Sequence, residues 1–159
     1  MKSLITLAAL AVAACWTSTA SAATAAADHV DEMKECAVCS VMAGDGELMK
    51  HMTWEIHKIG PGMLCITSVP ADLKDSFDAA GKKMMETVAG LAAKFQAGEQ
   101  VKLCSFCQAM AELMQAGAKQ ESVDTKTGSI LIVSSTDPAV IEKIHAHADK
   151  FNEAEAAAH

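Results

Sequence analysis

The stretch CAVCSVMA, residues 36–43, returns later in the chain as CSFCQAMA, residues 104–111. Both stretches follow the pattern Cys-x-x-Cys-x-x-Met-Ala. One Cys-x-x-Cys pair alone carries little information, whereas two pairs with a methionine at the same offset are much more specific. The repeat aligns Cys36 with Cys104 and Cys39 with Cys107.

Further landmarks recur in the same order once a three-residue insertion is allowed in the first half. They are Glu47-Leu48-Met49 with Glu112-Leu113-Met114, Gly62 with Gly128, and Pro70 with Pro138. A fixed order of landmarks indicates an internal duplication. We therefore expect a first repeat over residues 34–98 and a second over residues 99–151.

The hydrophobic pattern predicts the order helix, strand, strand, helix in each repeat. In the first we expect a helix from Cys36 to about Met52, strands over residues 53–59 and 63–69 joined by the turn Gly60-Pro61-Gly62, and a long helix from Pro70. In the second we expect a helix from Cys104 to about Gly117, a clear strand over residues 128–134, and a helix that begins at Pro138. The expected fold class is α+β, with internally duplicated α-β-β-α units and antiparallel hairpins.

Side-chain parity predicts the register of the first hairpin. If Ile59 pairs with Met63, the apolar residues of both strands gather on one face, and a shift by one residue would mix the faces. This register places His57 directly across from Cys65 on the opposite face. That pair is a second candidate metal site, although a buried free cysteine beside a histidine is the commoner arrangement.

The N-terminus predicts export. Met1-Lys2 is followed by an uncharged apolar run over residues 3–14, which suits a signal-peptide core and is too short to span a bilayer. Cleavage after Ala22 gives a signal peptide over 1–22, a flexible tether over 23–33 and a polar tail over 152–159. Cleavage before Cys15 is the alternative, and it would make the protein lipid-anchored at that residue. In both cases we expect a periplasmic or secreted protein.

Composition argues against several classes of function. The chain has a net charge of −7 and contains no arginine, the usual reader of phosphates and bases, so nucleic acid is not an expected partner. There is no glycine-rich phosphate loop, no Gly-x-Ser-x-Gly and no His-Glu-x-x-His, so the sequence does not indicate an enzyme.

The repeated motif instead predicts a soft-metal site. The N-terminus of a helix stabilises thiolate, the form of cysteine that binds metal. Positions i, i+3 and i+6 share one helical face, so Met42 can approach Cys36 and Cys39, as Met110 can approach Cys104 and Cys107. Thiolates with a thioether favour copper(I), bound or shuttled between a donor and an acceptor protein. Zinc would need all four cysteines in one site, and motif spacing does not decide between one site and two.

Two other functions use the same cysteines. Each pair can serve as a redox disulfide in a thiol–disulfide protein or sensor, or the two pairs can be structural disulfides in an interaction module. Cys65 is a fifth cysteine after the predicted signal peptide, and the odd count leaves at least one thiol unpaired within a monomer.

The order of a Cys-x-x-Cys motif, helix, strand, turn, strand and helix resembles the heavy-metal-associated domain, a ferredoxin-like fold of copper chaperones and metal-pumping ATPases. The similarity is clearest over Val101–Phe151. There, residues 101–103 would match the first strand, residues 128–133 the third strand, and residues 138–151 the second helix of that family. The resemblance implies that the Cys-x-x-Cys cysteines of each repeat hold the metal.

Overall fold

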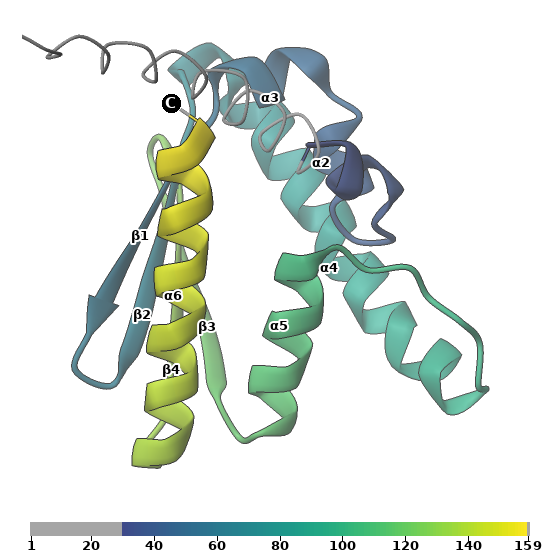
Figure 1. Ribbon diagram of the computed structural model, residues 1–159. Coiled ribbons are helices and arrows are strands. Elements are labelled where there is room, and N and C mark those ends of the chain that lie inside the picture. The colour runs from purple at the N-terminus through teal and green to yellow at the C-terminus, as the bar shows by residue number, and fades with distance from the viewer. Residues whose placement is uncertain (1–29, 159) are drawn as a thin grey trace, which may run out of the picture.

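The computed structural model describes residues 30–158, in an α+β arrangement (Figure 1). Residues 30–35 are helical. They are followed by α2 Ser40–Ala43, α3 Gly46–His51, β1 Thr53–Ile59, β2 Gly62–Ser68, the 3-10 turn η1 Ala71–Leu73, α4 Lys74–Gln96, α5 Ser105–Gln115, β3 Lys119–Thr125, β4 Gly128–Ser134 and α6 Pro138–Ala158. The α+β class and the antiparallel hairpins are thus confirmed. The expected signal peptide, the lipidation residue Cys15 and most of the tether lie outside the described residues.

Both halves of the chain contribute to one four-stranded antiparallel sheet, with strand order β1-β2-β4-β3. The two central strands pair with each other, so that Gly62 faces Ser134 and Ser68 faces Gly128. The β3–β4 pairing has the same form as the β1–β2 pairing, with a glycine at the start of the second strand in each hairpin. These strands occupy the positions that a duplication requires, and the duplication itself stays a prediction.

Two glycines allow the central strands to approach each other. A Cβ atom on Gly62 would collide with the carbonyl oxygen of Val133, and one on Gly128 would collide with that of Thr67. No residue with a side chain fits these positions without moving the backbone. The close approach explains why both strands begin with glycine.

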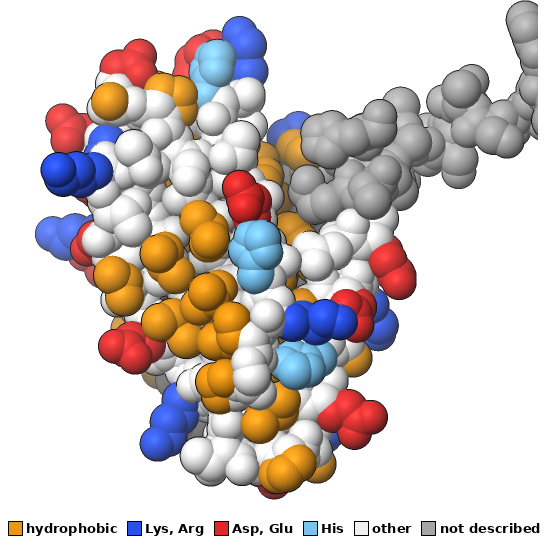
Figure 2. All heavy atoms as spheres, turned by 90° about the vertical axis from the view of Figure 1, so that its left-hand side faces the viewer, with side chains coloured by type: hydrophobic (Ala, Val, Ile, Leu, Met, Phe, Trp, Pro, Cys, Tyr) orange, Lys and Arg blue, Asp and Glu red, His pale blue; other side chains and the backbone are white. Residues whose placement is uncertain are grey.

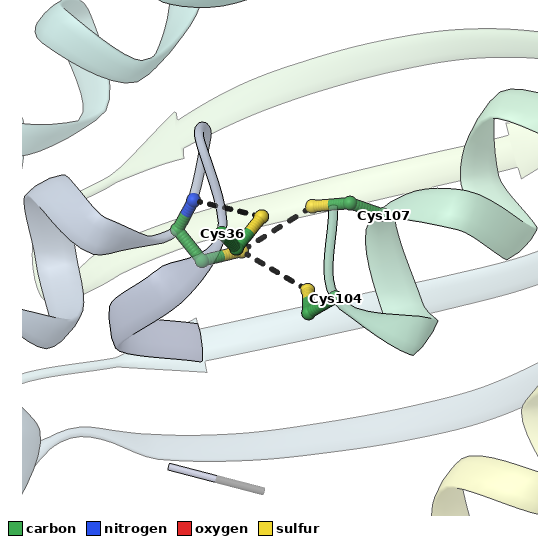
Figure 3. Close-up of side chains that lie close together, drawn as sticks. Cys36, Cys104 and Cys107 are labelled. Atoms are coloured by element: carbon green, nitrogen blue, oxygen red, sulfur yellow. Dashed lines mark hydrogen bonds between the residues drawn. The ribbon is translucent and has the colours of Figure 1, made fainter. Parts of the chain in front are cut away.

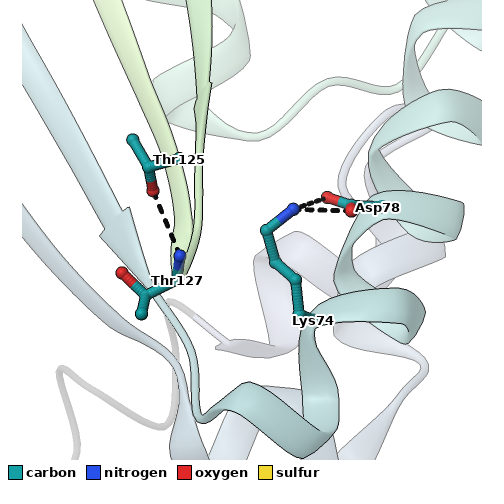
Figure 4. Close-up of polar contacts among 4 residues, drawn as sticks. All are labelled: Lys74, Asp78, Thr125 and Thr127. Atoms are coloured by element: carbon teal, nitrogen blue, oxygen red, sulfur yellow. Dashed lines mark hydrogen bonds and ion pairs between the residues drawn. The ribbon is translucent and has the colours of Figure 1, made fainter.

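Each hairpin turn is tied to the strand that leaves the other hairpin. The backbone N–H of Val69 donates to the carbonyl of Thr127 at 2.7 Å, and that of Ser135 donates to the carbonyl of Pro61 at 2.9 Å. Figure 4 shows two local contacts: the Thr127 N–H donates to the Thr125 hydroxyl at 3.4 Å within the second hairpin turn, and Lys74 pairs with Asp78 in the first turn of α4. The Val69–Thr127 and Ser135–Pro61 bonds fix the two hairpins relative to each other.

The predicted register of the first hairpin is wrong by one residue. Ile59 pairs with Gly62, so Ile56 lies opposite Cys65 and His57 lies opposite Leu64. The turn contains only Gly60 and Pro61, because Gly62 is needed in β2 for the close contact with β4. His57 and Cys65 therefore face opposite sides of the sheet, and they do not form a site together.

The first predicted helix is broken. Residues 36–39 form a turn, and α2 and α3 are separated at Gly44 and Asp45. Asp45 starts α3 as its N-cap, because its carboxylate accepts the backbone N–H of Leu48 at 3.0 Å. Residues 101–104 lie in neither helix nor strand, so the first strand implied by the family resemblance is wrong. The expected polar tail continues as helix, since α6 extends to Ala158.

The helices bury one face of the sheet. Ile56, Met63 and Val133 point from the strands into a core that includes Ile144 and Ala148 of α6. The opposite face belongs to none of the hydrophobic clusters, and Figure 2 shows hydrophobic side chains gathered on the surface there. No helix among residues 30–158 is long and apolar enough to cross a bilayer.

Candidate metal centre

The four motif cysteines converge on one point. The Sγ atoms of Cys36, Cys39, Cys104 and Cys107 all lie within 4.8 Å of one another. Figure 3 shows Cys36 near Cys104 and Cys107, which come from two separate backbone segments, the turn before α2 and the start of α5. The sequence could not decide between one shared site and two separate sites, and this geometry is that of one shared cluster.

The sulfur spacing suits a tetrahedral ion. Cys39 Sγ lies 3.3 Å from Cys107 Sγ and 3.7 Å from Cys104 Sγ. Four sulfurs at about 2.3 Å from a central zinc ion would be about 3.8 Å apart. An ion at the centre would therefore change each sulfur–sulfur distance by about 1 Å or less, which side-chain rotation can supply.

The local backbone explains how the first pair is presented. Residues 36–39 form a tight turn in which the backbone N–H of Cys39 points at Cys36 Sγ, at 3.4 Å. The turn is fastened to the second motif, because the N–H of Ala37 donates to the carbonyl of Lys102 at 2.8 Å. Cys104 is the N-cap of α5, so the second pair lies at a helix N-terminus, as the sequence predicts.

A second set of contacts clamps the N-terminal helix to α5. Glu32 accepts hydrogen bonds from the backbone N–H of Ser105 at 2.8 Å and from its hydroxyl at 2.9 Å, and so caps α5 from another segment. Lys102 forms an ion pair with Glu35. No motif in the sequence indicates these contacts. The one available signal is a pair of opposite charges: Glu35 directly precedes Cys36, and Lys102 lies two residues before Cys104.

Burial of the cluster is uneven. Cys36 and Cys104 are completely buried, Cys39 is 7% exposed, and Cys107 is only half-buried. Hydrophobic side chains surround the cluster, including Val38, Leu91 and the partly buried Met33 and Met84. No strand residue belongs to this group, so the site is built by helices and turns alone.

The thiols influence one another's protonation. The S–H groups of Cys107 and Cys39 stabilise the thiolate of Cys104 and lower its pKa to about 2. Hydrogen bonding to Cys104 in turn raises the pKa of Cys39 and of Cys107 above the ordinary cysteine value. In the metal-free cluster, hydrogen bonding thus favours thiolate at Cys104 over Cys39 and Cys107, and a bound cation would stabilise further thiolates beside it.

The motif methionines point elsewhere. Met42 packs with Leu48 and Phe77 in one hydrophobic cluster, and Met110 packs with Leu113 in another. Neither is in the group around the cysteines, where Met33 and Met84 provide the neighbouring thioethers. Ligation by Met42 and Met110 stays a prediction, which their packing does not favour.

Cys65 lies apart from the cluster. It packs against the core beneath α6, and burial raises the pKa of its thiol to about 11. His57 is exposed on the other face, with its Nε2 atom 3.0 Å from a carboxylate oxygen of Glu55.

No family model matches the chain, and no curated protein and no solved structure is significantly similar to it.

Proposed function

We propose that the protein binds one thiophilic metal ion through Cys36, Cys39, Cys104 and Cys107 together. The observation that carries the proposal is the convergence of the four Sγ atoms within 4.8 Å of one another. Four cysteine thiolates complete the tetrahedral coordination of one ion. A bound ion therefore explains why two segments so far apart in sequence bring their cysteines together.

Zinc is the ion that the cluster fits best. Tetrahedral sites with four sulfurs bind zinc or iron, and structural zinc sites are closed by four protein ligands. Copper(I), the preference from sequence, was based on two cysteines and a methionine at each of two sites. With four sulfurs in one cluster and the motif methionines in other clusters, copper(I) becomes the second candidate.

The ion would act as a structural link. It would join the turn at residues 36–39 to the start of α5, alongside the contacts of Glu32 and Glu35. Complete burial of Cys36 and Cys104 suits an ion that is retained more than one that is passed to an acceptor. The proposal includes export to an oxidising compartment, where a bound ion would also protect the thiols from oxidation.

Replacement of one pair tests the shared site. In the Cys36→Ser/Cys39→Ser variant, two of four ligands are lost, so we expect no metal to remain after desalting. The Cys65→Ser variant is the matched control and should keep one ion per chain. Zinc, copper and iron are measured by elemental analysis on protein reduced, reconstituted with each metal and desalted. An ion retained by the double variant, or two ions in the unaltered protein, would show separate sites.

One observation favours a second function, thiol–disulfide chemistry. Cys39 Sγ and Cys107 Sγ are only 3.3 Å apart, and Cys107 is the most accessible of the four thiols. A Cys39–Cys107 disulfide would join the two motifs to each other, whereas the sequence suggests one disulfide within each motif. Full reduction of the cluster without bound metal, in protein taken from its own compartment, would count against both functions.

A further inference from the structure

The outer face of the sheet carries a block of apolar side chains. Leu64 and Ile66 of β2 pair with Ile132 and Ile130 of β4, and Val123 of β3 pairs with Ile130. Alternation along the strands places all five on the same face, opposite to Met63 and Val133 of the core. We call these five residues the outer apolar block.

The outer apolar block is uncovered within the described part of the chain. None of its members belongs to a hydrophobic cluster of the described residues. Val123 is 44% exposed, and the other four are half-buried. The open face of an antiparallel sheet is normally polar. A contiguous apolar patch rimmed by polar residues marks an interaction surface, and Figure 2 shows such a patch.

The charged residues at the rim of the block favour a second copy of the chain as its partner. In one row across the sheet the residues are His57, Leu64, Ile132 and Glu121, and in the next they are Glu55, Ile66, Ile130 and Val123. The acidic rim residues and the net charge of −7 disfavour an anionic lipid surface or nucleic acid. A second copy, turned about an axis parallel to the strands, brings β1 of one chain over β3 of the other. His57 then meets Glu121 of the second copy on both sides of the apolar block.

We propose that the outer apolar block is the interface of a homodimer, in which two sheets pack face to face. Sheets pack in this way about 10 Å apart with nearly aligned strands, and the twofold axis makes the same patch serve both chains. The metal centre involves only helices and turns, so dimer formation and metal binding are independent. Failure of one proposal therefore leaves the other standing.

The size of the face predicts a weak dimer. Four strands spaced about 4.8 Å apart and seven residues long cover about 450 Å² in projection. A standard interface buries about 800 Å² on each partner, so this one is at the low end of stable contacts. We expect dimer dissociation at micromolar concentration, and hence a mass that depends on protein concentration.

Sedimentation velocity of the full-length protein from about 1 to about 500 μM tests the interface. We expect the dimer to form with rising concentration. Ile130→Lys should raise the dissociation constant at least tenfold, because it buries a charge in the block. The matched control, Met85→Lys, alters a side chain on α4 that is 62% exposed, and should leave the constant unchanged. Circular dichroism confirms that each variant folds.

A charge exchange tests the orientation. His57→Glu should weaken the dimer several-fold, because it would face Glu121 of the second copy, and the double variant His57→Glu/Glu121→Lys should restore it. A chain that is monomeric at every concentration overturns the proposal. So does a dimer that Ile130→Lys leaves intact. Flotation of the unaltered protein with phosphatidylcholine vesicles would assign the face to lipid instead.

Discussion

Cys39 Sγ lies 3.3 Å from Cys107 Sγ, so the second cysteine of one motif contacts the second cysteine of the other. Cys39 Sγ also lies 3.7 Å from Cys104 Sγ. Within the first motif, the contact is made by the backbone N–H of Cys39, which donates to Cys36 Sγ. The two motifs are thus halves of a single cluster.

This contact predicts which disulfide forms when the metal-free protein is oxidised. Hydrogen peroxide converts two thiols to one disulfide and is reduced to two molecules of water. We expect the product to join Cys39 to Cys107, since these sulfurs are only 3.3 Å apart and Cys107 is the most accessible thiol of the four. Mass spectrometry of non-reduced peptides identifies the pair. Zinc-loaded protein should react much more slowly, and disulfides confined within each motif would disprove the expected pairing.

Metal binding should release protons. Hydrogen bonding to Cys104 raises the pKa of Cys39 and of Cys107, so both are thiols at pH 7 in the metal-free protein. Zinc binds thiolates and displaces at least these two protons, so the apparent affinity should fall by at least about a hundredfold for each unit of pH lost near neutrality. Calorimetric titrations in buffers of different ionisation enthalpy count the protons. Cys65→Ser should release the same number, and release of fewer than two would refute this protonation scheme.

Removal of the ion should lower stability. Free zinc at a hundred times its dissociation constant stabilises the folded state by about 2.7 kcal/mol, which raises Tm by roughly 8 °C for a chain of this size. Thermal unfolding followed by circular dichroism, with zinc and with a chelator, measures the difference. Cys65→Ser should keep the shift and Cys107→Ser should lose it. If Cys107→Ser retained the full shift, that residue would not be a ligand.

The sheet offers a test that does not involve metal. Gly62→Ala should destabilise the protein by about 2–4 kcal/mol, because its Cβ would collide with the Val133 carbonyl. Gly81→Ala is the control, since it adds a Cβ to α4 with no atom within 4 Å, and should stabilise the protein by about 0.5–1 kcal/mol. Urea unfolding gives both values. Equal stability of the two variants would mean that β2 and β4 do not approach as described.

Much of the fold follows from local sequence signals. Residues 53–59 and 128–134 are strands with the predicted bounds, and α6 begins at Pro138 as expected, because these segments combine clear periodicity with proline or glycine boundaries. The repeat implies a strand before β4, but the sequence does not locate β3, because Lys119–Thr125 is polar and this edge strand has no buried residue to produce a pattern. The predicted pairing of Ile59 with Met63 is wrong because Gly62 belongs to β2, where it closely approaches Val133 of β4. That contact involves the other hairpin, so the sequence of the first hairpin does not show it.

The metal site was predictable only in part. The four cysteines were identified by the repeat of the motif, since residue type and spacing are local properties. Their meeting in one cluster depends on how α5 docks beside the turn at residues 36–39, which is a long-range contact with no local signal. The same is true of Met84, which reaches the cluster from α4.

The proposed site has four cysteine sulfurs around one ion, and X-ray absorption at the zinc edge of the zinc-loaded protein counts those sulfurs. We expect a single shell of four sulfurs at about 2.3 Å from zinc, unchanged in Cys65→Ser. A shell of two sulfurs with nitrogen or oxygen ligands at about 2.0–2.1 Å would contradict it, because each motif would then bind metal without the other.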